Sequence, residues 1–138
     1  MSKAIHFFRP RQQDVRQGQL VVSLYDGALQ YLQQVRNQMV AQKYANRGLL
    51  LDRVLEIIRE LSKSLDVQSG GDLAVRLNNL YLLCSAHILR ANQKMCIDDL
   101  DAVVMILSRL RSIYATFPGV VVKKKYAETP SVEKDVCF

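Results

Sequence analysis

Leu20–Leu32, with the sequence LVVSLYDGALQYL, is the densest apolar segment of the chain. Its apolar side chains recur at three- and four-residue steps, and this period, typical of an amphipathic helix, continues through Val35 and Met39. A glycine inside a helix costs roughly 1 kcal/mol relative to alanine, so we expect Gly27 to let another backbone approach closely. We expect the Asp26 carboxylate to be exposed or hydrogen-bonded, because burying it unpaired would be costly.

The length and composition of the chain limit its class. Its 138 residues, of which 49% are hydrophobic, suffice for one domain with a real core and argue against a wholly disordered protein. No apolar run approaches the roughly 18 residues that span a bilayer. The start, MSKAIHFFRP, has no apolar core of signal-peptide length before Arg9. We therefore expect a protein of the cytosol without membrane insertion.

The cysteines do not indicate a disulfide framework or a zinc site. Cys84, Cys96 and Cys137 are odd in number and never in C-x-x-C spacing. Cys84 and His87 stand one helical turn apart, and a nucleophile or half of a metal site could be built from such a pair. No third ligand or orienting acid is close to them in sequence, so a core cysteine beside a partly exposed histidine is the preferred interpretation. We expect no cofactor, no metal and no enzymatic activity.

The net charge of +6 is dispersed along the chain. Residues 1–17 and 118–138 together carry +4 of it, outside the expected helices. A protein that binds nucleic acid usually concentrates its basic residues on one face, beside aromatic or base-contacting side chains. We therefore do not expect a nucleic-acid partner.

The hydrophobic period predicts four helices separated by short connections. They are expected at about 18–43, 50–65, 72–92 and 97–117. DVQSGG at 66–71 is the clearest loop, in which the Gly-Gly pair would supply a positive φ. Short connections favour antiparallel neighbours. The sequence thus predicts an all-α, antiparallel up-down four-helix bundle at 18–117, with an N-terminal arm at 1–17 and a flexible tail at 118–138.

Three leucines of the third expected helix do not fit its apolar stripe. Leu82, Leu83 and Leu89 lie off the stripe that carries Leu77 and Tyr81. We expect some of the three to be exposed or to face a partner.

Several motifs resemble those of one known family. Leu24–Leu29, LYDGAL, is similar to the signature of the flagellar secretion chaperone family FliS. The resemblance extends over about residues 20–117, in the same register. Further matching residues are Ser64-Leu65-Asp66, Gly70-Gly71, Leu73-Ala74, Leu77, Leu80-Tyr81, Ala91-Asn92, Lys94, Leu100-Asp101 and Val103.

The chain departs from the family pattern at five places. Arg16-Gln17-Gly18-Gln19 replaces a Ser-Pro-Glu-Glu helix cap, and Phe7 stands where the family has a tyrosine. Ala86-His87 replaces an arginine pair. The tryptophan usual near the end of the last helix is missing, and the tail after Pro118 is longer. These differences bear on the identity of the partner more than on the fold.

The resemblance implies a cytosolic, non-enzymatic export chaperone. Such a chaperone binds the disordered C-terminal segment of flagellin along apolar grooves, prevents premature polymerisation and delivers flagellin to the flagellar type III export apparatus. A helical adaptor or regulatory module that binds another protein or a nucleic acid is the alternative. An export-gate or regulatory protein as second partner, and a monomer or a homodimer, stay open.

The resemblance also suggests where a partner would bind. Phe7 and Phe8 would belong to an arm that covers part of the groove in the free state. Ordinary core packing is the alternative for every groove residue, the leucines above all. The groove residues are expected to be Tyr25, Leu29, Leu77, Leu80, Tyr81 and Asn92.

Overall fold

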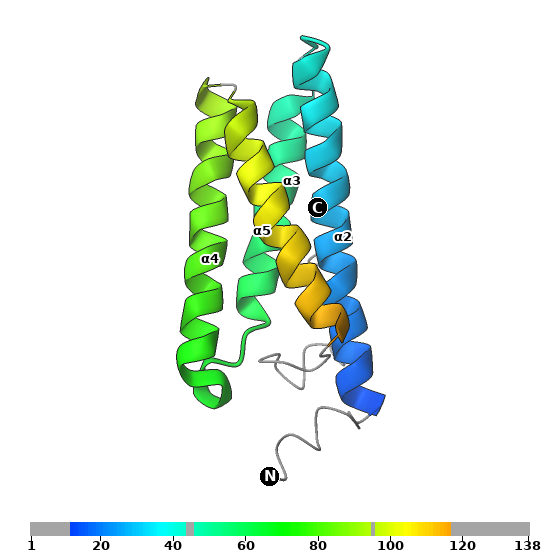
Figure 1. Cartoon of the computed structure of the whole chain (residues 1–138), viewed down its shortest axis with the longest axis vertical. Coiled ribbons are helices and arrows are strands. Elements are labelled where there is room, and N and C mark those ends of the chain that lie inside the picture. The colour runs from blue at the N-terminus through cyan, green and yellow to red at the C-terminus, as the bar shows by residue number, and fades with distance from the viewer. Residues whose placement is uncertain (1–11, 44–45, 95, 117–138) are drawn as a thin grey trace.

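The chain forms a bundle of helices in a computed structural model that describes residues 12–43, 46–94 and 96–116. Within these ranges there are four helices and no strand (Figure 1). The helices are α2 (Gln12–Val40), α3 (Arg47–Lys63), α4 (Val67–Lys94) and α5 (Ile97–Thr116).

Each helix runs antiparallel to the one before it, so the chain passes up, down, up and down (Figure 1). α2 packs against α3 and α5, and α4 packs against the same two helices, so α2 and α4 occupy opposite corners. α5 crosses the front of the bundle at a tilt (Figure 1). The predicted all-α, up-down four-helix bundle is confirmed.

The core is formed by the inward faces of all four helices. Val21, Leu32 and Val35 of α2 are fully buried at the three- and four-residue steps noted in the sequence. Leu51 and Leu61 of α3 face them across the interior and belong to the same apolar cluster. Burial of these stripes is the main contribution to helix stability, because helices in proteins are stabilised mostly by tertiary packing of an amphipathic face rather than by intrinsic propensity.

The starts of α2 and α4 lie more than three residues before the expected ones. α2 begins at Gln12, six residues before the expected start at Gly18. The segment 12–17 lacks an apolar period, but Gln and Arg have high helix propensity and extend the helix. The expected loop at 66–71 was wrong only in part, because residues 67–70 form one helical turn, which the non-helical Gly71 separates from the helix that continues at Asp72. Gly71 interrupts this helix with φ 53° and ψ −130°, so the predicted positive φ is confirmed at that residue.

The prediction for Gly27 was wrong. A Cβ built at this glycine would meet one neighbouring atom within 4 Å, Ile57 Cδ1 of α3 at 3.5 Å, which is ordinary van der Waals contact. No backbone approaches the glycine closely. The mid-helix position therefore carries the propensity cost of glycine without a packing reason for it.

Alanine at the two glycines is expected to change stability in opposite directions. Gly27→Ala should raise the free energy of unfolding by roughly 0.5–1 kcal/mol, since the position is helical and has room for a methyl group. Gly71→Ala should lower it by about 1–2 kcal/mol, since φ 53° is unfavourable for a residue with a Cβ. Urea denaturation followed by circular dichroism checks both changes. A destabilised Gly27→Ala variant would contradict this account of the α2–α3 contact.

Candidate partner-binding face and the core beneath it

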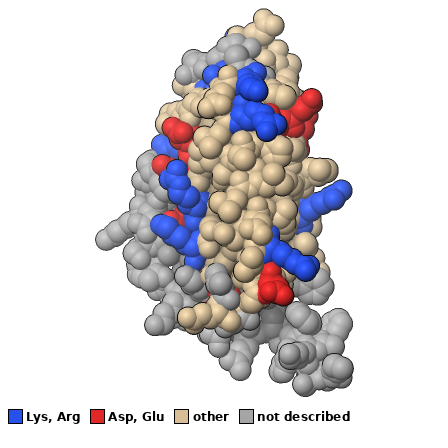
Figure 2. Space-filling model, turned by 90° about the vertical axis from the view of Figure 1, so that its left-hand side faces the viewer, with Lys and Arg blue, Asp and Glu red and all other residues tan. Residues whose placement is uncertain are grey.

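The outward surface of α4 carries an unusual share of exposed apolar side chains. Among the described residues, more large apolar side chains are exposed on α4 than on any other helix. Figure 2 shows this side of the molecule as a vertical uncharged band, with Lys, Arg, Asp and Glu at its flanks. We define the outer face of α4 as six exposed residues of this helix. They are Val75, Asn79, Leu82, Leu83, Ala86 and Leu89.

The exposure of this face is large enough to require a reason. Leu82 is 61% exposed and Leu89 is 52% exposed, although Leu82 lies in the middle of a long helix and Leu89 lies more than one turn before its end. Contiguous exposed apolar surface on a soluble protein commonly marks a site of interaction with another molecule. The sequence predicted that some of Leu82, Leu83 and Leu89 would be exposed, and the structure confirms this for all three.

Two tyrosines meet beneath this face, inside the core. The hydroxyls of Tyr25 on α2 and Tyr81 on α4 lie 2.5 Å apart and share a hydrogen bond across the diagonal of the bundle. The ring of Tyr114 on α5 lies beside them, with its centroid 5.6 Å from that of Tyr25. Burial raises the pKa of all three phenols, so they stay neutral and can donate hydrogen bonds at any physiological pH.

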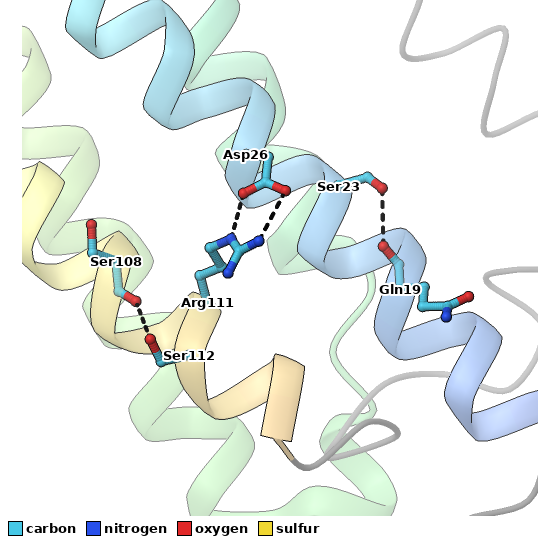
Figure 3. A network of polar contacts seen from close by, with 6 residues as sticks. All are labelled: Gln19, Ser23, Asp26, Ser108, Arg111 and Ser112. Carbon is cyan, nitrogen blue, oxygen red and sulfur yellow. Dashed lines mark hydrogen bonds and ion pairs between the residues drawn. The ribbon is translucent and has the colours of Figure 1, made fainter.

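Asp26 joins α2 to α5. Arg111 of α5 donates hydrogen bonds from Nε and Nη2 to the two carboxylate oxygens of Asp26 (Figure 3). A second ion pair between the same helices joins Arg36 Nε to Asp101 Oδ1 at 3.0 Å. The sequence left Asp26 either exposed or hydrogen-bonded, and the structure shows a partly exposed carboxylate that is hydrogen-bonded. The bidentate geometry orients the two helices relative to each other.

His87 has an acidic partner that the sequence analysis missed. Its Nδ1 lies 2.7 Å from Oδ1 of Asp99, at the start of α5, and Arg90 Nη1 lies 3.9 Å from the same oxygen. The hydrogen bond with His87 is the main cause that lowers the pKa of Asp99. Twelve residues separate this pair in the sequence, and only the turn between α4 and α5 brings them together.

The stability of the protein is expected to depend on pH through Asp99. A carboxyl whose pKa is lower in the folded state stabilises the fold above its unfolded-state pKa, and this contribution is lost as the pH falls through the folded-state pKa. Between pH 7 and pH 3, the wild type should therefore lose more stability than Asp99→Asn, which has no carboxylate to protonate. Urea denaturation of both proteins at the two pH values measures the difference. Equal losses would contradict a stabilising role of the ionised carboxylate.

The neighbouring cysteine is unsuited to nucleophilic chemistry. Cys84 is fully buried, and burial raises the pKa of its thiol to about 11. The reactive form of a cysteine is the thiolate, which is scarce at neutral pH for such a thiol. The structure therefore favours a core cysteine here. No group of side chains that could hold a metal ion occurs within residues 12–43, 46–94 and 96–116.

The residues expected in the groove do not share one surface. Tyr25, Leu77 and Tyr81 lie in the core, so in this conformation they offer no surface to a partner. The hydroxyls of the two tyrosines hydrogen-bond to each other inside the core instead of facing solvent. Leu29 and Leu80 are half-buried and pack against the core. Contact of these residues with a partner stays a prediction.

Asn92 has a structural contact, and the arm residues cannot be placed. Arg47, at the start of α3, donates hydrogen bonds to the side chain and the backbone oxygen of Asn92, at 3.4 and 3.3 Å. Asn92 therefore joins the end of α4 to the start of α3. Phe7 and Phe8 lie outside the described residues.

The fold and the α4 surface together define a class of protein, namely a four-helix bundle with an exposed apolar helix face. None of its described helices is both long and apolar enough to cross a lipid bilayer. Comparison with known sequences gives the family. The sequence model of the flagellar protein FliS matches residues 10–119, and the chain belongs to this family.

Two curated relatives agree with this assignment. The flagellar secretion chaperone FliSB of Pseudomonas aeruginosa is 31% identical over 99 residues, which cover 72% of this chain and 79% of that protein. The flagellar secretion chaperone FliS of Vibrio cholerae is also 31% identical over 99 residues, which cover 72% of this chain and 73% of that protein. The resemblance seen in the sequence is confirmed.

Proposed function

We propose that this chain is a cytosolic export chaperone that holds the C-terminal segment of flagellin as a helix against the outer face of α4. The main support for the proposal is the exposed apolar band along this helix, in a chain that belongs to the FliS family. An amphipathic helix that lays its apolar side on such a surface is a recurrent mode of peptide recognition.

The energetics suit a partner that is disordered before it binds. A disordered segment loses conformational entropy when it folds on a surface, so a long apolar contact is required to offset this cost. The exposed side chains from Val75 to Leu89 span 14 residues, or about 21 Å at 1.5 Å per residue. A partner helix of four turns would cover them. Covering its own apolar side in this way would keep flagellin from polymerising before it reaches the type III export apparatus.

The N-terminal arm adds a testable part to this proposal. Phe7 and Phe8 would dock on the apolar face of the free chaperone and leave when flagellin binds. A docked arm lowers the apparent affinity by the fraction of molecules in which it is docked. Deletion of residues 2–12 should therefore tighten flagellin binding or make the free protein aggregate. A deletion variant that changes neither would contradict the arm.

Co-expression with the flagellin of the same genome tests the proposed function. Size-exclusion chromatography should show a complex with intact flagellin and no complex with flagellin that lacks about its last 50 residues. Absence of a complex with every encoded flagellin would contradict the proposal. A nucleic-acid shift at low salt, lost at high salt, would then favour the alternative of an adaptor with another partner.

A further inference from the structure

The outer face of α4 has a seven-residue repeat. Val75, Leu82 and Leu89 are separated by intervals of seven, and Asn79 and Ala86 lie four residues after the first two. All five side chains are exposed. In a coiled coil, the residues of the seam alternate at steps of four and three along one face of each helix. The large side chains of the seam pack between side chains of the second helix.

One edge of this seam is basic. Arg76, Leu83 and Arg90 each follow a large seam residue by one position, so they lie along the same edge at the same seven-residue interval. Lys94 extends this edge towards the end of α4, and Asp72 is an acid at its beginning. All four charged residues are exposed, and the edge carries more positive than negative charge.

From this pattern we propose that the partner helix pairs with α4 in a coiled-coil register and carries Asp or Glu opposite Arg76 and Arg90. The inference rests on the proposed function, because it describes the segment that the same face would bind. Charges at the edges of a coiled-coil seam select the partner and its orientation more than they add affinity. The apolar seam thus binds a helix, and the basic edge determines which helix and in which register.

The two smaller side chains of the seam refine the description of the partner. Ala86 leaves room for a large apolar side chain between Leu82 and Leu89. The amide of Asn79 needs a polar group opposite it, since a polar seam residue that loses water without a hydrogen bond is costly. The predicted segment therefore has apolar residues opposite Leu82, Ala86 and Leu89 and a polar residue opposite Asn79. It carries acidic residues along the side that faces the basic edge.

A second copy of this chain would gain no net attraction from the charges of this edge. Two copies of α4 packed antiparallel through this face would bring Arg76 of one copy towards Arg90 of the other, and in the same register Asp72 of one copy towards Lys94 of the other. Like charges that face each other across a seam are destabilising. An acidic partner removes this repulsion and replaces it with ion pairs.

Charge reversal at Arg76 is the sharpest test, because Arg90 is also close to Asp99. Arg76→Glu in the full-length chain should raise the Kd for flagellin about tenfold at 50 mM NaCl, and about twofold at 500 mM NaCl, where salt screens exposed charges. Lys43→Glu is the matched control, since Lys43 is an exposed lysine after the end of α2. It changes the net charge equally and should leave the Kd unchanged. Isothermal titration calorimetry gives all six values.

A second arm of the experiment identifies the acids in the partner. Asp→Lys and Glu→Lys substitutions are placed one at a time in the last 50 or so residues of flagellin. One of them should weaken binding to the wild type and restore binding to Arg76→Glu. If wild type and Arg76→Glu bind flagellin equally at 50 mM NaCl, the charged register is overturned and the proposed function stands. If the wild type binds no flagellin, both are overturned.

Discussion

Leu82→Ser is expected to weaken flagellin binding by about ten- to a hundredfold while the free chaperone stays folded. Leu82 is the most exposed apolar side chain on α4, so it contributes little to the core. On the proposed face it would be buried by the partner, and burial of a leucine side chain is worth about 1.5–3 kcal/mol. Calorimetric titration gives the affinity, and circular dichroism together with thermal unfolding shows whether the fold is intact.

Leu49→Ser is the control for Leu82→Ser. Leu49 is 58% exposed but lies in the first turn of α3, outside the set of residues that forms the outer face of α4. The two variants lose the same apolar group from a similarly exposed position, so a general effect on solubility or stability would affect both. Equal weakening by both variants, or normal binding by Leu82→Ser, would contradict the assignment of the face.

Among conservative substitutions, loss of one hydroxyl from the Tyr25–Tyr81 pair in the core should have the largest effect on stability. Tyr81→Phe removes one hydroxyl and leaves that of Tyr25 buried without its partner, which costs about 1–3 kcal/mol. Tyr25→Phe should cost a similar amount for the same reason. The double variant removes both polar groups and leaves an apolar contact of similar shape, so its stability should be close to that of a single variant or higher.

A double-mutant cycle of urea unfolding measures this coupling. The cycle isolates the interaction of the two hydroxyls from the other effects of each substitution. If the losses in Tyr25→Phe and Tyr81→Phe simply add in the double variant, the hydroxyls do not interact. That result would contradict the diagonal contact between α2 and α4.

The helices could be predicted from the sequence because their apolar period is strong and their connections are short. The predicted helix boundaries were wrong where the residue pattern of a segment does not indicate its backbone conformation. The segment before Gly18 has no apolar period yet is helical, and the polar run before Gly71 completes a helical turn. Gly27 was misjudged because a sequence does not show which atoms of a neighbouring helix lie opposite a glycine.

The candidate face could be predicted only in part. Leu82, Leu83 and Leu89 were recognisable because they fall outside the stripe that faces the core. Core packing was an open alternative for Tyr25 and Tyr81, but the sequence could not show that their hydroxyls pair, because the two residues lie on helices at opposite corners of the bundle. The partner of His87 was missed for a similar reason, since Asp99 belongs to the next helix.

Binding of flagellin along the outer face of α4 can be observed residue by residue in a methyl NMR titration. The 15.7-kDa chain with labelled leucine and valine methyl groups is titrated with a peptide of the last 50 or so residues of flagellin. We expect the signals of Val75, Leu82, Leu83 and Leu89 to shift and reach saturation together, while those of Val40 and Leu49 stay in place. Changes confined to Val40 and Leu49, or none at all, would contradict binding along this face.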